Sequence, residues 1–472
     1  MKKIIFISIT ISVLLSGCKE SFIDLDRPLV STESVIFTNP AKTEMTVLGL
    51  YATLKAADYM GGRTYIAFDA MGDDIMNIDP NGVTLYNTYI MQVFTTTQEN
   101  APAWNTPYLA INRANVFLES LEEYNTAEII GDALAKQYIA EAKFVRAFAY
   151  YYLVQLYAPP YKLNKGAKAI PLRLTAIKGS GHSDQPCTTN TKILETILND
   201  LSDSEIAALP ATTSVKNRAT KGAALMLKMR TLMLMENWQG AIAAGEAVSG
   251  YELIDDVFAP FVAPYTTNES IFTFLHTAND QPGTQRSPWE YYNNGRLLVI
   301  DRANGVMSKP NYSLAADKRI KAFDGGPISD PLYTDHCNLL LKFPLRPCGT
   351  PIFRFAETKL NLAECYAQSN REGDARSALT QVRRRSIAAD DDPLDISALT
   401  GAALLEAISN EKRLEFIGEG MRGLDIMRKG ETFYKTGSLT GAITVTPQSQ
   451  FYFWPIPEDE RVNNALWDQL EP

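Results

Sequence analysis

The sequence has few of the motifs on which hydrolytic and metal-dependent enzymes rely. It contains only three histidines, and no H-E-x-x-H, G-x-S-x-G or glycine-rich phosphate loop, the motifs that supply a zinc site, a nucleophilic serine and a phosphate cradle. A glycosidase needs two carboxylates at a set separation. Asp69, Asp73 or Asp74 could supply the first, but no residue is identified as the second. We therefore expect a binding protein that is not an enzyme and needs no cofactor, with a glycoside hydrolase as the disfavoured alternative.

An excess of basic charge is also absent. The formal net charge is -9 and no stripe of lysine and arginine appears, whereas a nucleic-acid partner requires a basic surface that neutralises phosphates. The run Arg383-Arg384-Arg385 is better explained as the cationic end of a helix than as a phosphate site. Nucleic acid is therefore excluded from the expected partners.

Cysteine is scarce, and no C-x-x-C pair indicates zinc binding or redox work. In an exported protein, Cys337 and Cys348 could form a disulfide across their short loop. Two unpaired, buried thiols are the favoured interpretation.

Long apolar runs are missing except for Ile4 to Leu15, which is too short to span a bilayer, since a spanning helix takes about 20 residues. Lys2 and Lys3 precede this run and Ser16-Gly17-Cys18 follows it. Charged, apolar and small residues in that order form a secretory signal, and the cysteine is the nucleophile that takes a diacylglyceryl group.

We therefore expect a signal peptide over residues 1–17 and a lipid on Cys18. Each buried acyl methylene contributes roughly 0.8 kcal/mol, so two or three chains anchor a protein stably. Residues 18–40 are then a lipidated N-terminal segment, and residues 41–472 form a single domain that is tethered to the membrane without spanning it.

Apolar residues at helical spacing predict a mainly α fold. The clearest stripe runs from Lys136 to Tyr157 and ends at Pro159-Pro160. A second hairpin joins Lys221–Met235 to Gly240–Val248 through Asn237-Trp238, and a third joins Phe353–Gln368 to Ala375–Arg385 through a turn at Glu372-Gly373-Asp374. Alanines at the helix crossings, opposite an aromatic residue or leucine, are typical of tetratricopeptide-like helix pairs.

The hairpins fall at about residues 104–157, 191–250 and 353–428, and long irregular segments separate them. We expect loop-rich insertions at about residues 60–100 and 251–350, too long to be simple connections. Together these insertions form a large irregular lobe, and loops of this kind on a helical scaffold usually carry function.

Two segments that we expect to lie outside the regular helices have the composition of a sugar site. Such a site offers flat aromatic faces to the sugar ring and polar side chains to its hydroxyls. The first contains Arg63, Tyr65, Asp73, Asn77, Asn81 and Tyr86, and the second contains Trp289, Tyr291, Tyr292, Asn293, Asn294 and Arg296. Core packing is an equally good explanation for Tyr65 and Tyr86. Trp104, Trp238 and Trp454 are expected to be structural.

Two further patterns imitate functional sites. Asn77-x-Asp79-x-Asn81-Gly82 resembles the start of a calcium loop, but Pro80 intervenes and Thr88 stands where the bidentate glutamate belongs, so a polar turn is favoured. Glutamates at positions 411, 415 and 419 alternate with arginines, which predicts a structural ion-pair network in preference to a catalytic centre.

Several blocks along the whole chain resemble the SusD/RagB family of outer-membrane nutrient-binding lipoproteins. These blocks are Phe22–Pro28, Trp104–Asn115, Glu141–Tyr150, Phe353–Glu364, Asn410–Asp425 and Pro455–Asn464.

The resemblance implies four tetratricopeptide-like helix pairs in a SusD-like α/α superhelix. It also implies an irregular lobe that captures an oligosaccharide or, in some members, a peptide. Members of this family cover a SusC-like TonB-dependent transporter and deliver ligand to it. Lys19-Glu20 after the lipidated cysteine resembles the signal that places such lipoproteins on the outer face of the outer membrane.

Overall fold

The computed structural model describes residues 33–179, 183–294, 297–328, 337–436 and 441–471. The expected signal peptide, Cys18 and Lys19-Glu20 lie outside these ranges. Within the described ranges, no helix is both long enough and apolar enough to cross a membrane.

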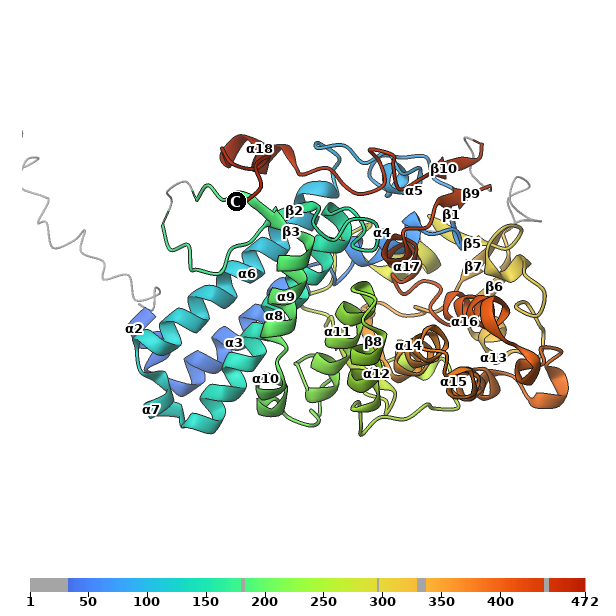
Figure 1. Ribbon diagram of the computed structural model, residues 1–472, viewed down its shortest axis with the longest axis horizontal. Helices are drawn as coiled ribbons and strands as arrows, with labels where there is room; N and C mark the ends of the chain where they lie inside the picture. The colour runs from blue at the N-terminus through green and yellow to red at the C-terminus, as the bar shows by residue number, and fades with distance from the viewer. Residues whose placement is uncertain (1–32, 180–182, 295–296, 329–336, 437–440, 472) are drawn as a thin grey trace, which may run out of the picture.

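The first half of the chain builds a layer of long helices. Helices α3 (Pro40–Leu54), α6 (Asn100–Glu123) and α8 (Asp132–Tyr157) contact one another and lie side by side in Figure 1. Ala158 ends α8 in an extended conformation, because a residue that precedes proline is disfavoured in the helical region. The shorter helices packed nearby are α2 (Glu33–Phe37), α7 (Thr126–Ile130), α9 (Asn190–Asp200) and α10 (Asp203–Ala208).

The second predicted hairpin is present as α11 (Lys221–Leu234) and α12 (Trp238–Glu246). The side chain of Asn237 accepts a hydrogen bond from the backbone of Gly240 and so caps α12. Gly245 lets the next hairpin approach closely, since a Cβ at this position would lie 2.9 Å from the Leu362 side chain.

The third predicted hairpin is α14 (Phe355–Gln368) with α15 (Glu372–Ser386). The turn predicted at residues 372–374 is wrong, because these residues form the first turn of α15, where Glu372 and Asp374 favour the helix dipole. The chain reverses just before them. Helices α16 (Gly401–Glu415) and α17 (Arg422–Lys429) follow.

The expected loop-rich lobe contains more regular structure than the sequence indicated. It holds α4 (Arg63–Met71), α5 (Tyr86–Tyr89), α13 (Lys318–Phe323) and the π-helical turn η3 (Trp289–Asn294). The two predicted ligand segments therefore do not lie wholly outside helices, which corrects that expectation.

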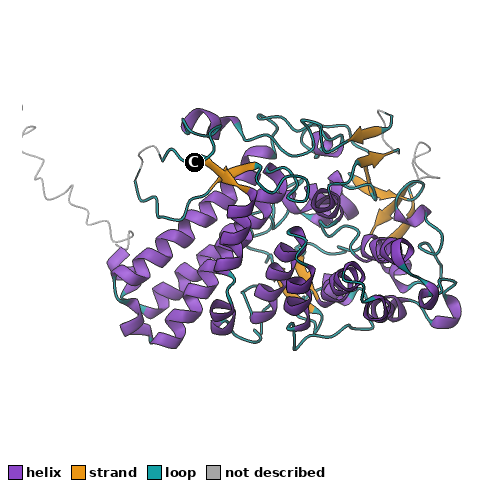
Figure 2. Ribbon diagram, viewed as in Figure 1, coloured by secondary structure: helices purple, strands orange, loops and turns teal. Residues whose placement is uncertain are grey.

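The strands are short pieces among helices and loops (Figure 2). One antiparallel sheet has the order β1 (Ile75–Asn77), β5 (Leu298–Asp301), β7 (Cys337–Leu340), β6 (Asp324–Pro327). The other pairs are β2 (Lys168–Pro171) with β3 (Cys187–Thr189), β4 (Ser270–Phe274) with β8 (Thr350–Arg354), and β9 (Phe433–Lys435) with β10 (Ile443–Val445). A last short helix, α18 (Glu458–Asn463), lies near the C-terminus.

A single hydrophobic core connects the helical layer to the lobe. Rings from α8 and β4 meet in it, for example Phe144 and Phe272 with centroids 5.6 Å apart. Cys337 and Cys348 are buried as free thiols, as are Cys187 and Cys365. The favoured interpretation of unpaired thiols is therefore confirmed.

Candidate functional site

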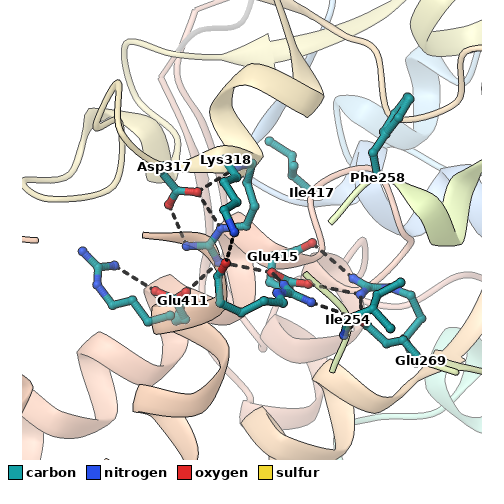
Figure 3. Close-up of polar contacts among 12 residues, drawn as sticks. Ile254, Phe258, Glu269, Asp317, Lys318, Glu411, Glu415 and Ile417 are labelled. Atoms are coloured by element: carbon teal, nitrogen blue, oxygen red, sulfur yellow. Dashed lines mark hydrogen bonds and ion pairs between the residues drawn. The ribbon is translucent and has the colours of Figure 1, made fainter. Parts of the chain in front are cut away.

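The glutamates at positions 411, 415 and 419 form a buried ion-pair network with arginines from several elements. Arg319 is fully buried and donates to Glu411 at 2.6 Å and to Asp317 at 2.8 Å. On its other oxygen, Glu411 accepts from Arg383 at 2.9 Å, and Arg383 also binds Asp392 at 2.7 Å. Figure 3 shows Glu411 and Glu415 joined by dashed lines to neighbouring basic side chains.

Arg354, the last residue of β8, links the same ion-pair network to the sheet formed by β4 and β8. Its guanidinium contacts Glu269, binds both oxygens of Glu419 at 2.7 Å and lies 3.1 Å from Glu415. Arg385 also binds Glu415 at 2.6 Å. Burial alone would raise the pKa of Glu415, but Arg385, Arg354 and Arg319 hold that pKa well below its ordinary value.

Nearly every charged group in this network has an opposite charge as its partner. Lys342 is also buried there, and burial lowers its pKa to about 8, yet its ammonium group donates to Glu419 and to the carbonyls of Glu415 and Ile417. Charged side chains that are buried and paired with one another in this way hold helices and strands in position, and they are covered from a ligand. The prediction of a structural network is confirmed.

Four of the predicted ligand residues are brought together by the fold, but inside it. Arg63, Tyr65, Tyr291 and Tyr292 are each less than 5% exposed. The Tyr65 hydroxyl donates to the carbonyl of Pro351 at 3.0 Å. These four side chains support the lobe from within, so a ligand cannot touch their ring faces or guanidinium in this conformation.

Asp69 lies beside these residues and is a buried carboxylate whose pKa is raised. It accepts hydrogen bonds from the Tyr292 hydroxyl at 2.9 Å and from the backbone of Gly420 at 2.7 Å. Burial raises its pKa to about 7. Its titration therefore falls near neutral pH, and this property allows an experimental test of the packing between α4 and η3.

Asp73 is held by two arginines. Arg422 binds it at 2.5 Å and Arg413 lies 3.2 Å from it. Although burial opposes ionisation, the two guanidinium groups lower the pKa of Asp73 to about 2. Asp73 thus anchors α16 and α17 to the segment after α4.

The segment from Asn77 to Thr84 is the polar turn that we predicted. Asn77 accepts from the backbone of Asp79 at 2.9 Å and donates to the carbonyl of Thr84 at 2.8 Å. The exposed Asn81 accepts from the backbone of Val83 at 3.1 Å. The amides in this turn hold the backbone, while the Asn81 side chain as a whole remains exposed.

Trp289 and Tyr86 keep part of their surface accessible. The guanidinium of Arg346 lies 5.7 Å from the centroid of the Trp289 ring, and Arg346 is fixed by Glu290 at 2.8 Å. The backbone of Asn294 belongs to the same turn, and its side chain lies outside the described part. Trp289 can therefore offer a ring to a ligand, whereas Tyr291 and Tyr292 cannot.

An exposed aromatic ring, Phe94, and a small polar cleft that begins at the next residue lie just beyond the first predicted segment, and both were missed. Phe94 is 50% exposed and packs edge-on against Phe451, with ring centroids 5.6 Å apart and planes at 81°. The adjoining cleft has a volume of about 190 Å³. It is lined by Thr95, Thr96, Thr97, Gln98, Ala101, Pro457, Glu458 and Asp459. We call these residues, with Phe94 and Phe451, the Phe94 cleft.

Asn100 joins the two distant segments that form the Phe94 cleft. Its side chain donates to the carbonyls of Phe94 and Pro455, each at 3.0 Å. Thr97 accepts from the backbone of Phe94 at 2.8 Å and so fixes the turn. In the sequence, the only local signal is an aromatic residue followed by three threonines and a glutamine, just beyond the predicted segment, which runs from Arg63 to Tyr89.

Three tryptophans were expected to be structural, and the structure confirms this for two of them. Trp104 and Trp454 are almost fully buried, at 1% and 2% exposed, which confirms their structural role. Trp238 packs against the core but is only partly covered, and it borders a separate cleft among the helical hairpins.

Comparison with known proteins matches two family models to this chain. The model described as "SusD family" covers residues 346–471, and the model described as "Starch-binding associating with outer membrane" covers residues 22–231. A curated SusD-like protein of Formosa agariphila is 24% identical over 88% of this chain and 87% of its own length.

Solved structures give the same result. A SusD superfamily protein from Bacteroides fragilis is 49% identical, with a TM-score of 0.86 over 92% of this chain and 100% of that chain. A structure described as a SusD-like carbohydrate binding protein from Bacteroides vulgatus is 17% identical, with a TM-score of 0.74 over 91% of this chain and 97% of that chain. The chain therefore belongs to the SusD family.

Proposed function

We propose that this protein binds an oligosaccharide at the cell surface and does not cleave it. The observation that carries the proposal is the exposed ring of Phe94 beside a cleft lined by hydroxyl, amide and carboxylate groups. Family membership supports it, because one matching family model is described as starch-binding and a structural relative as carbohydrate-binding.

The chemistry of the Phe94 cleft suits a sugar. The flat face of Phe94 can cover the apolar C–H face of a pyranose ring. Thr96 and Gln98 supply hydrogen-bond donors and acceptors, and Glu458 and Asp459 supply acceptors for sugar hydroxyls.

We include Trp289, Tyr86 and Asn81 in the proposed ligand surface, since each keeps accessible atoms. Arg63, Tyr65, Asp73, Tyr291 and Tyr292 are proposed to act indirectly, by holding that surface in place. This division follows from burial and from the internal partners of the second group.

Delivery to a transporter completes the proposal. The chain is proposed to be anchored by lipid on Cys18 to the outer membrane, facing the exterior, and to pass its ligand to a SusC-like TonB-dependent barrel. The description of one family model, which includes association with the outer membrane, supports this location. Co-purification of the barrel with the tagged lipoprotein, lost when Cys18 is replaced by serine, would test the arrangement.

Screening the purified protein on an array of plant, host and microbial glycans tests the binding role. We expect selective binding to at least one oligosaccharide. Binding to a peptide mixture but to no sugar would instead favour the peptide-binding role known to be compatible with this family. Release of reducing ends from a bound glycan would favour a hydrolase.

A further inference from the structure

A second and larger cleft lies among the helical hairpins. Its volume is about 550 Å³, within the range of about 300–1,000 Å³ that small-molecule sites occupy. Its walls come from the start of α12, the end of α14, part of α16 and the end of α17. The wall residues that matter most are Trp238, Lys309, Gln368, Ser409, Asn410 and Glu431.

Asn410 is a buried amide that faces this cleft. It is only 7% exposed and lines the cleft, yet its side chain makes no hydrogen bond with any residue in the described ranges. The next three residues of the same motif, Glu411, Lys412 and Arg413, are all held in ion pairs. The amide atoms of Asn410 are not among the fully buried, unpartnered polar atoms of the described residues, so they open onto the cleft, where a ligand can hydrogen-bond to them.

The charges around the cleft are largely neutralised within the protein. Arg428 binds Glu364 at 2.7 Å, and Arg413 binds Asp74 at 2.7 Å. Other cations of the walls are likewise paired, Lys429 with Asp425 at 2.7 Å and Lys162 with Glu236 at 3.2 Å. Among the described residues, the wall charges without an ion pair are Lys309, Glu406 and Glu431, so the unpaired charges include both signs. A lining balanced in this way does not select an ionic ligand and suits a neutral one.

Trp238 gives the cleft a flat apolar surface. It is the first residue of α12, partly covered by the core and partly open to the cleft. Gln368, Ser409 and Glu431 add amide, hydroxyl and carboxylate groups around it. An aromatic plane surrounded by uncharged donors and a few acceptors is the arrangement that binds a polyhydroxylated ring.

We infer that this cleft is a second binding site, which takes one or two neutral pyranose rings stacked on Trp238 and hydrogen-bonded to Asn410. It shares no residue with the Phe94 cleft. The second site can therefore exist whether or not the Phe94 cleft is the site of capture, and the two can be tested separately.

The test uses the full chain, purified in a detergent without a sugar headgroup and carrying Phe94→Ala to disable the first cleft. Maltose, cellobiose and mannobiose are titrated into it by calorimetry. We expect saturable binding of at least one disaccharide, weakened about fivefold or more by Asn410→Ala and lost with Trp238→Ala. Trp238→Phe should restore part of the affinity. Gln239→Ala, at the exposed neighbouring position, should leave it unchanged.

Any of three results would overturn the inference. In the first, the Phe94→Ala protein binds none of the three disaccharides, and in the second, Asn410→Ala and Trp238→Ala leave the affinity for a disaccharide unchanged. The third result is binding of a tripeptide mixture, but of no sugar, with the same dependence on Trp238. Equal affinity of the parent and Phe94→Ala proteins, with loss on Trp238→Ala, would contradict capture at the Phe94 cleft while supporting the second site. Melting temperatures of all variants control for folding.

Discussion

Phe94 is the side chain on which the proposed sugar contact depends most directly. Replacing it with alanine should weaken glycan binding by about 5–30-fold, equivalent to about 1–2 kcal/mol, with little change in melting temperature because half of the ring is already exposed. Met45→Ala is the matched control, since Met45 is 70% exposed on α3. Equal losses in the two variants would show that Phe94 is not a ligand contact.

A separate prediction concerns the contribution of Trp289 to glycan affinity. Its ring lies near the guanidinium of Arg346 and packs partly against the core, and the part that stays accessible can meet a ligand. Trp289→Ala should reduce glycan affinity, and Trp289→Phe should retain most of it because a planar ring remains. Calorimetric titration of both variants measures this. A lower melting temperature for Trp289→Ala with unchanged affinity would assign Trp289 to packing alone.

Asp69 gives a pH dependence whose sign can be derived. Its pKa is raised by burial to about 7 in the folded protein, whereas an unfolded aspartate titrates near about 3.9. The folded state therefore holds the proton more tightly. The stability from this group is fully present below about pH 4 and is lost as the pH rises toward 7.

Asp69→Asn tests that derivation, because an amide oxygen can still accept from Tyr292 and Gly420 but cannot ionise. The melting temperature of the variant should rise relative to the parent as the pH increases from 5 to 8. The difference between the two proteins cancels the contributions of all other titrating groups that they share. A difference that stays constant across this range would contradict the raised pKa.

At the scale of elements, Arg354 ties β8 to Glu269, the residue before β4, and to the end of α16. Arg354→Met would leave the carboxylates of Glu269, Glu415 and Glu419 buried and close together. We expect a loss of about 3–5 kcal/mol in the free energy of unfolding, since removing one partner of a buried ion pair strands the other charge. Urea unfolding followed by circular dichroism measures it.

The matched control for this prediction is Arg371→Met. Arg371 pairs with Asp374 at 2.7 Å on the surface, where the two side chains are 41% and 52% exposed. Exposed pairs of this kind contribute little to stability, so the urea midpoint should hardly move. If the two variants unfold at the same urea concentration, the buried network does not join these elements in the way described.

The elements also show which parts of the fold could be predicted. Helix α8 was predicted because apolar residues recur at helical spacing along its 26 residues and Pro159-Pro160 ends it, although its second half is buried on all sides. Helix α4 was not, because every residue from Arg63 to Met71 is buried. A helix covered on all sides lacks the polar face that produces a period in the sequence, so its polar and aromatic residues were interpreted as a ligand loop.

At the scale of the whole molecule, the candidate site escaped prediction for a different reason. Phe94 and Phe451 are far apart in the chain, and Asn100 joins the segments through a contact across 355 residues. No local pattern indicates which aromatic residues remain exposed after such a contact forms. Tyr292 and Phe94 are each followed directly by polar residues in the sequence, yet one is fully buried and the other half exposed.

The central claim concerns the whole protein, which is proposed to bind an oligosaccharide without cleaving it. The most direct measurement is a calorimetric titration of the purified protein with the best glycan from the array, with reducing ends assayed in the same sample over a day. We predict saturable binding and no increase in reducing ends. No saturable binding to any glycan on the array, or a steady release of reducing ends from the bound glycan, would contradict the account.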